Sequence, residues 1–199
     1  MRALLVFLSH GGPKRRPPPI VRPLLPGAGR SRSMNRKLYI LLPILLLGVG
    51  LDLATKEWIL RSLPLGGQIT VVDGFFNVVH IHNRGGVFGL MAAWPLAYLR
   101  VFFVCTTGIV LAVVGYLWWR LPEDHRLAGL GYSLIMAGAL GNLVDRVRMG
   151  EVVDFLDFYW GRYHWPAFNV ADIMICLGAG FLVWVILKEE KGVDVSSPA

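Results

Sequence analysis

Two aspartates, Asp154 and Asp172, lie in polar patches at the edges of hydrophobic segments of a strongly apolar chain. Carboxylates near a bilayer core are rare unless they pair, line a water-filled cavity or do chemistry. Two carboxylates that the fold brings together can share one proton, because they cannot both ionise at low cost. One can then take a proton from water while its protonated partner donates to a scissile carbonyl. An aspartic protease activates water in this way.

The spacing of the two aspartates leaves a structural alternative open. Asp is a favoured N-cap residue, so Asp172 can begin the last hydrophobic helix while Asp154 caps a turn. The sequence has no evident Ser/His or Cys/His arrangement and no nucleotide-binding fingerprint. His80 and His82 would share one face of a strand, but no third metal ligand stands out. We therefore expect no metal and no cofactor.

An asparagine precedes an aspartate by three residues at two places, as Asn142 in NLVD and Asn169 in NVAD. Residues i and i+3 share a helix face, so each amide can donate a hydrogen bond that orients a carboxylate. A polar contact between helices explains the same residues equally well. The residues alone leave both interpretations open.

Two pairs of opposite charge lie near the same segments. Asp52 and Lys56 are spaced i, i+4, so they can pair across one helical turn or act as a cap and a snorkelling lysine. Asp145 and Arg146 are adjacent, and a structural ion pair or a headgroup contact explains them better than catalysis. The residues leave both pairs open as part of a site and favour a structural role for the second.

Four hydrophobic segments are long enough to cross a bilayer, at residues 38–54, 101–119, 127–144 and 170–187. Segments of this kind must be helices, because lipid offers no partner to an open backbone. The sequence therefore predicts a mainly α fold, a four-helix transmembrane bundle. In this topology the polar candidates at residues 52, 83, 142, 145, 146, 154, 169 and 172 all lie at one membrane face.

Two long connections lie at that face. Residues 55–99 contain ITVV and FFNVVHIH around Asp73-Gly74, which predicts a small strand pair or β cradle at the outer membrane surface. Residues 145–169 are predicted to be a second long loop that carries Asp154 and is anchored at the interface by Tyr and Trp.

The charge pattern separates the N-terminal segment from the body of the chain. The formal net charge is +7, but residues 1–37 carry nine Lys or Arg and no acid, which leaves −2 for the remainder. Nucleic-acid binding by the body is therefore not expected. Lys and Arg are denser per residue on the side of the termini, so the positive-inside rule predicts cytoplasmic termini and an active site toward the periplasm.

The domain organisation follows from composition. Residues 1–33 hold six of the twelve prolines and are predicted to be a disordered N-terminal extension. Residues 34–190 are predicted to form a single integral-membrane domain, and residues 191–199 a flexible tail. Met34 is an alternative start. We expect a monomer.

Four blocks of sequence resemble one family, lipoprotein signal peptidase or signal peptidase II. They are LDLATK (51–56), HNRGGVFG (82–89), GALGNLVDRVRMGEVVDFLDF (138–158) and PAFNVADIMICLG (166–178). The third and fourth blocks are the specific ones, because GNxxDR followed by VVDF and FNxAD is chemically unusual beside membrane segments. The resemblance covers about residues 36–188.

The resemblance implies a bacterial inner-membrane aspartic endopeptidase with four transmembrane helices. Such an enzyme removes the signal peptide from diacylglyceryl-modified prolipoproteins, cuts before the lipidated cysteine and is inhibited by globomycin. Its partners would be the lipidated prolipoprotein and membrane lipid. Carried onto this chain, the catalytic residues are Asp154 and Asp172. The implied substrate-binding and supporting residues are Asn83, Asn142, Asp145, Arg146, Asn169, Asp52 and Lys56.

Two other functions remain open. A proton-coupled transporter or small channel also uses intramembrane acids, but it predicts acids near the midplane and repeated halves. A non-enzymatic scaffold would use the aromatic loops to bind partners and the acids as ion pairs. Asp154→Asn and Asp172→Asn separate the peptidase from the scaffold, since only a peptidase loses cleavage.

Overall fold

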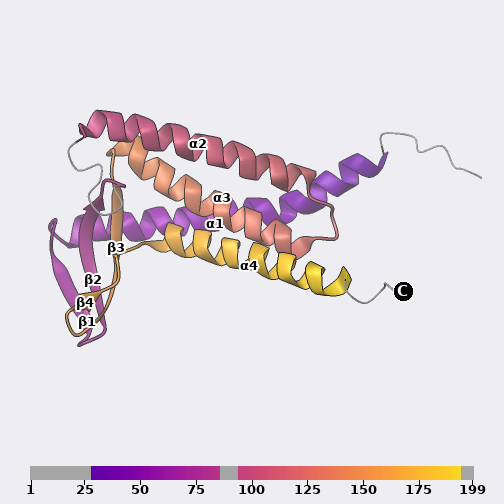
Figure 1. Ribbon diagram of the computed structural model, residues 1–199. Helices are drawn as coiled ribbons and strands as arrows, with labels where there is room; N and C mark the ends of the chain where they lie inside the picture. The colour runs from indigo at the N-terminus through magenta and orange to yellow at the C-terminus, as the bar shows by residue number, and fades with distance from the viewer. Residues whose placement is uncertain (1–27, 86–93, 194–199) are drawn as a thin grey trace, which may run out of the picture.

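The computed structural model describes residues 28–85 and 94–193, and these form a four-helix bundle with a small sheet at one end (Figure 1). The helices are α1 (Ala28–Ser62), α2 (Leu96–Arg120), α3 (Arg126–Arg148) and α4 (Val170–Val193). The strands are β1 (Gln68–Val72), β2 (Phe76–Asn83), β3 (Val152–Trp160) and β4 (Tyr163–His164). Within the described part of the chain, four helices are long and apolar enough to cross a membrane, which confirms the four predicted spans.

The first helix is longer than predicted at both ends. It continues past residue 54 to Ser62. The charged residues there indicated a loop, but in the structure they form i, i+4 ion pairs within the helix. Glu57 and Arg61 pair at 2.8 Å, and Asp52 and Lys56 do the same one turn earlier. At the other end, α1 begins at Ala28, inside the predicted extension and just beyond its last proline. Residues 1–27 of that extension lie outside the described residues.

The last helix also exceeds its prediction. It continues to Val193 instead of ending at residue 187, so the first part of the predicted tail is helical. The sequence from Leu187 onward, LKEEKG, is charged but contains no proline that would stop a helix. Residues 194–199 lie outside the described residues.

Helix α3 lies at the centre of the bundle and packs against the other three helices (Figure 1). Its contact with α4 depends on glycines that let the two backbones approach closely. A Cβ atom built on Gly178 would lie 2.6 Å from the carbonyl oxygen of Gly131, and one built on Gly131 would lie 2.9 Å from that of Gly178. Neither position has room for a side chain.

We expect Gly178→Ala to destabilise the bundle by about 1–3 kcal/mol, because the new methyl group meets backbone that cannot move aside. Thermal unfolding in detergent would measure the change. Gly180→Ala is the matched control on the same helix, since a Cβ atom there meets nothing within 4 Å. Equal melting temperatures for the two variants would contradict this account of α3–α4 packing.

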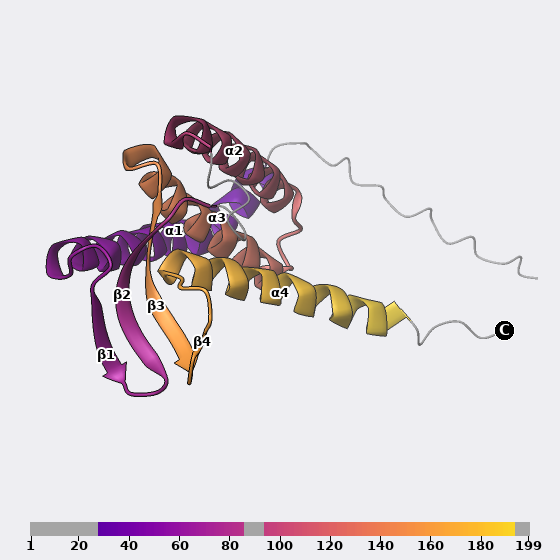
Figure 2. The ribbon, with the colours of Figure 1, turned by 60° about the vertical axis from the view of Figure 1, so that its left-hand side comes forward.

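The sheet is antiparallel, with the strand order β1-β2-β3-β4 (Figure 2). The predicted hairpin around Asp73-Gly74 is confirmed, and Gly74 adopts the positive φ of 75° that its turn requires. The predicted second loop is wrong, because β3 carries Asp154 within a buried run of strand. Val152, Val153 and Phe155 favour a strand, but the acid between them, Asp154, interrupts the apolar pattern.

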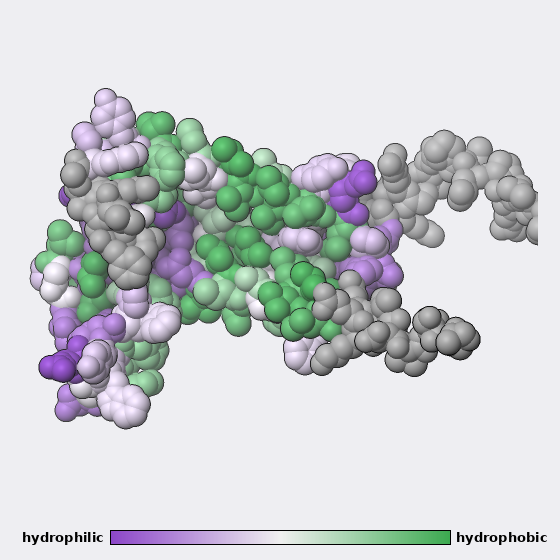
Figure 3. All heavy atoms as spheres, in the orientation of Figure 1, coloured by the Kyte–Doolittle hydropathy of each residue, from purple (hydrophilic) through white to green (hydrophobic). Residues whose placement is uncertain are grey.

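The surface separates into two zones (Figure 3). Apolar side chains cover the helices, and large exposed ones such as Leu46, Val113 and Trp184 suit contact with lipid. Polar side chains gather toward the sheet and at the opposite end of the bundle. The molecule therefore has an apolar belt with polar ends, as the predicted spans require.

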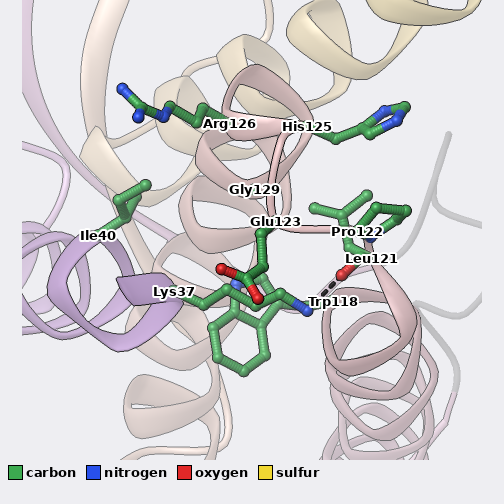
Figure 4. A pocket seen from close by; sticks show the side chains of 9 residues that line it. All are labelled: Lys37, Ile40, Trp118, Leu121, Pro122, Glu123, His125, Arg126 and Gly129. Carbon is green, nitrogen blue, oxygen red and sulfur yellow. Dashed lines mark hydrogen bonds between the residues drawn. The ribbon is translucent and has the colours of Figure 1, made fainter. Parts of the chain in front are cut away.

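The end opposite the sheet has a small hollow between α1, α2 and α3 (Figure 4). There the Lys37 ammonium donates to the carbonyl oxygens of Trp119, at 3.1 Å, and of Leu121. These carbonyls lie at the C-terminal end of α2, where a cation is favourable. Lys37 therefore caps a helix, and the hollow holds none of the candidate carboxylates.

Candidate active site

The N-terminus of α4 is fixed by an exchange of hydrogen bonds between Asn169 and Asp172. The backbone N–H of Asp172 donates to Asn169 Oδ1 at 3.0 Å, and the backbone N–H of Asn169 donates to Asp172 Oδ2 at 3.2 Å. This is the geometry of a capping box, with Asn169 in the cap position. The structural alternative made Asp172 the N-cap of this helix. In the structure Asn169 is the N-cap, and Asp172 is the acidic residue of the capping box. Its carboxylate lies at the positive end of the helix dipole.

Side-chain amides reach the two aspartates crosswise. Asn142 Nδ2 donates to Asp172 Oδ1 at 2.8 Å, and Asn169 Nδ2 donates to Asp154 Oδ1 at 2.7 Å. One interpretation of the i, i+3 spacing is that each amide orients the aspartate of its own motif. In the structure each amide instead orients an aspartate from another segment, because the fold brings α3, β3 and α4 together.

Asn169 contacts both carboxylates, Asp154 through its side chain and Asp172 through its backbone. Asn83, at the end of β2, completes the site by donating from Nδ2 to Asp154 Oδ2 at 2.9 Å. Both oxygens of Asp154 therefore accept a hydrogen bond from an amide. The two candidate catalytic residues lie in one network at the junction of the sheet and the bundle.

The two carboxylates differ in environment. Asp154 is only 2 % exposed, whereas Asp172 is half-buried. Burial and the nearby charge of Asp172 together raise the pKa of Asp154 to about 6, against the lowering effect of hydrogen bonds from Asn83 and Asn169. Asp154 therefore holds a proton more readily than an ordinary aspartate.

A buried lysine supports this network from α1. Lys56 Nζ lies 2.8 Å from Asp52 Oδ2 and 2.9 Å from Asp145 Oδ2, and it donates to Asn142 Oδ1 at 3.0 Å. The predicted pair of Asp52 and Lys56 is confirmed. The ion-pair partner of Asp145 is Lys56, which corrects the predicted pairing with Arg146. The cause is that α1 and α3 approach closely here.

The carboxylates on either side of Lys56 also reach the backbone of the site. Asp52 Oδ1 accepts the backbone N–H of Ala171 at 2.9 Å, and Asp145 Oδ2 accepts that of Val153 at 3.3 Å. Asp52 therefore holds the first turn of α4, and Asp145 holds the start of β3. These are the two segments that carry the candidate catalytic residues.

Arg146 lies beside the network, with its guanidinium 5.0 Å from the centroid of the Phe103 ring. The carboxylates of Asp154 and Asp172 are within electrostatic reach of this guanidinium. All nine residues proposed from the sequence thus meet at one end of the bundle. Sequence reasoning missed Glu151. Its partners, His82 and Arg84, lie at and just after the end of β2, far away in the sequence.

Comparison with known proteins places the chain in a family. Residues 44–188 match the family model described as Signal peptidase (SPase) II. The chain belongs to the signal peptidase II family. It is therefore a peptidase and a multi-pass bacterial membrane protein, in agreement with its four apolar helices.

Relatives in the signal peptidase II family cover most of the chain. The lipoprotein signal peptidase of Geobacter sulfurreducens is 45% identical over 141 residues, which span 71% of this chain and 87% of the relative. That of Desulforapulum autotrophicum is 45% identical over 139 residues, 70% of this chain and 86% of the relative. A solved structure described as a bacterial membrane enzyme, determined in meso at 2.3 Å, has a TM-score of 0.66 and 27% identity, and covers 85% of this chain and 95% of its own.

Proposed function

We propose that this chain removes the signal peptide from diacylglyceryl-modified prolipoproteins by cutting just before the lipidated cysteine. Asp154 and Asp172 are the catalytic residues. The observation that carries the proposal is the contact of Asn169 with both carboxylates, at the only end of the described bundle where acids, amides and a sheet meet. Membership of the family supports the choice of substrate.

The proposed chemistry divides the work between the two carboxylates. Asp172 is the less buried, and as a carboxylate it takes a proton from water while the water oxygen bonds to the scissile carbonyl carbon. Asp154 donates its proton to the carbonyl oxygen. Collapse of the tetrahedral intermediate then breaks the C–N bond. The leaving nitrogen takes the proton that Asp172 received, and one hydroxyl of the intermediate returns a proton to Asp154 as the carbonyl re-forms.

The arrangement of the molecule supports substrate entry from the bilayer. Acyl chains remain in lipid beside the apolar helices, while the sheet at the membrane surface holds the peptide. We place the active site toward the periplasm and both termini in the cytoplasm, because Lys and Arg are denser on the side of the termini. Residues 34–190 act as one membrane domain, and the enzyme works as a monomer without nucleic acid, metal or cofactor.

The direct test is cleavage of a synthetic lipopeptide by the purified protein in detergent micelles. The peptide carries a signal sequence and a diacylglyceryl-cysteine, and mass spectrometry identifies the products. We expect one cut, with the lipidated cysteine as the new N-terminus, and no cut when the cysteine is unmodified or globomycin is present. Intact lipopeptide, or equal cleavage of the unmodified peptide, would refute the proposal.

The rate should depend on the proton held by Asp154. The pair is active with one proton, and Asp154 loses that proton as the pH rises through about 6. We therefore expect kcat/KM to fall above that pH by up to about tenfold per pH unit. A rate that is constant between pH 5 and 8 would argue against a protonated Asp154.

Removing Asn83 should move this pH dependence in a defined direction. The hydrogen bond from Asn83 favours the ionised form of Asp154 and so lowers the pKa of Asp154. Asn83→Ala therefore shifts the fall in kcat/KM to higher pH. The same pH series measures the shift, and a shift to lower pH would contradict the assignment.

A further inference from the structure

Four side chains form a hydrogen-bonded chain beside the end of β2, and none has a part in the proposed chemistry. His80 Nδ1 lies 2.9 Å from the carbonyl oxygen of Leu63, and the Nε2 atoms of His80 and His82 lie 3.1 Å apart. His82 Nδ1 lies 2.9 Å from Glu151 Oε2, and Arg84 Nε donates to Glu151 Oε1 at 2.8 Å.

The partners of the two histidines determine where their protons lie. A carbonyl oxygen only accepts, so His80 Nδ1 carries a hydrogen. Hydrogen bonds from Arg84 and His82 outweigh burial and lower the pKa of Glu151, so this carboxylate is ionised and His82 Nδ1 also carries a hydrogen. Two neutral rings would then place two bare Nε2 lone pairs 3.1 Å apart. One additional proton between them turns this repulsion into a hydrogen bond.

The same chain holds the residues on either side of Asn83. Successive side chains of a strand point to opposite faces, so His82 and Asn83 lie on opposite faces of β2, and Arg84 follows directly after the strand. Both neighbours bind Glu151, one at each carboxylate oxygen. Asn83 then donates to Asp154 Oδ2 at 2.9 Å and accepts the backbone N–H of Gly85 at 2.7 Å. Glu151 thus fixes the end of β2 through the two residues that flank Asn83.

We propose that His80 and His82 share one proton between their Nε2 atoms, and that this protonated pair, with Glu151 and Arg84, positions Asn83 against Asp154. The proposal rests on the catalytic function proposed for Asp154. The four are positioning residues, since they act on the carboxylate through Asn83. The pair carries one positive charge and shares the negative charge of Glu151 with Arg84.

Few charged groups face this pair. The Leu63 carbonyl lies just after α1, and the backbone N–H of His80 donates to the carbonyl of Gly67, just before β1. Glu151, just before β3, and Arg84, just after β2, supply the charges. Loss of the shared proton would therefore leave His82 held by Glu151 but repelled by His80.

The shared proton can be detected without any cleavage assay. In protein labelled with ¹⁵N in the histidine rings and held in detergent micelles, we expect both Nδ1 atoms to be protonated at pH 8. Both Nε2 atoms should give ¹⁵N chemical shifts between the values of a protonated and an unprotonated ring nitrogen. His80→Gln and His82→Gln identify the signals. Bare Nε2 atoms in both rings, or intermediate shifts that disappear when EDTA removes metal ions, would overturn the proposal.

The positioning function has a separate test in the pH dependence of kcat/KM. Glu151→Gln should shift the fall in kcat/KM to higher pH, as Asn83→Ala does, and should lower the maximum about tenfold. The double variant Asn83→Ala/Glu151→Gln should match Asn83→Ala alone, because Glu151 acts through Asn83. His164→Gln is the matched control, a histidine paired with Asp157 at 2.9 Å at the other end of β3.

The outcomes separate this inference from the proposed function. Additive losses in the double variant, or an unshifted fall in Glu151→Gln, would refute positioning even if the enzyme cleaves lipopeptides. An enzyme that does not cleave them would refute the proposed function, and the ring-nitrogen spectra would still decide whether the proton is shared.

Discussion

Asp154→Asn and Asp172→Asn should each lower kcat/KM for a lipidated prolipoprotein at least about a thousandfold, the scale of a lost general acid or base. Asp172→Asn removes the group that takes the proton from water. Asp154→Asn removes the proton donor to the carbonyl oxygen. An amide is the nearest match in size to a carboxylate, so the change isolates the chemistry. The rate of lipopeptide cleavage measures the effect.

Folding must be measured together with activity. Both oxygens of Asp154 accept amide hydrogens, so an asparagine there sets its own N–H₂ group against Asn83 or Asn169. We therefore expect some loss of melting temperature in Asp154→Asn, with normal membrane insertion. Asp73→Asn, in the exposed turn between β1 and β2, is the control and should keep full activity. Full activity in either active-site variant would end the assignment of that residue.

Lys56→Met should destabilise the folded protein by roughly 3–5 kcal/mol, more than the added methyl group of Gly178→Ala. Lys56 is 1 % exposed and forms ion pairs with both Asp52 and Asp145, which are themselves almost fully buried. Without the ammonium group, two carboxylates remain buried with no cation between them. The same two carboxylates bind the backbone of α4 and β3, so the site should be lost with the fold.

Thermal unfolding and the yield of folded protein in detergent measure this effect. Lys188→Met, at an exposed position of α4, is the matched control and should change stability by less than about 0.5 kcal/mol. The triple variant Lys56→Met/Asp52→Asn/Asp145→Asn removes the buried charges together and should recover part of the lost stability. A Lys56→Met protein as stable as the native one would contradict the ion-pair network.

The sequence predicted the four membrane-spanning helices, for a physical reason. A transmembrane helix is specified locally, by about 20 apolar residues in succession. The polar residues stood out because the membrane makes them costly. The β1–β2 hairpin was predicted for a similar reason, since its Asp73-Gly74 turn lies within a few residues of both strands.

The sequence did not predict the contacts that lie between segments far apart in the chain. Strand β3 pairs with β2 across about seventy residues, and its acids at positions 154 and 157 interrupt the expected alternation. The crossed amides of Asn142 and Asn169 depend on how α3 and α4 are packed. Of the three polar partners of Lys56, only one lies on the same helix. None of these can be deduced from spacing alone.

The double duty of Asn169 has a consequence for antibiotic resistance. Asn169 caps α4 and also binds Asp154. A mutation of Asn169 that weakens the binding of an inhibitor would therefore damage both the helix and the chemistry. An inhibitor that binds the Asn169 amide should therefore select escape mutations elsewhere, if at all. Serial passage of bacteria that depend on this enzyme would test the expectation, and viable escape mutants altered at position 169 would disprove it.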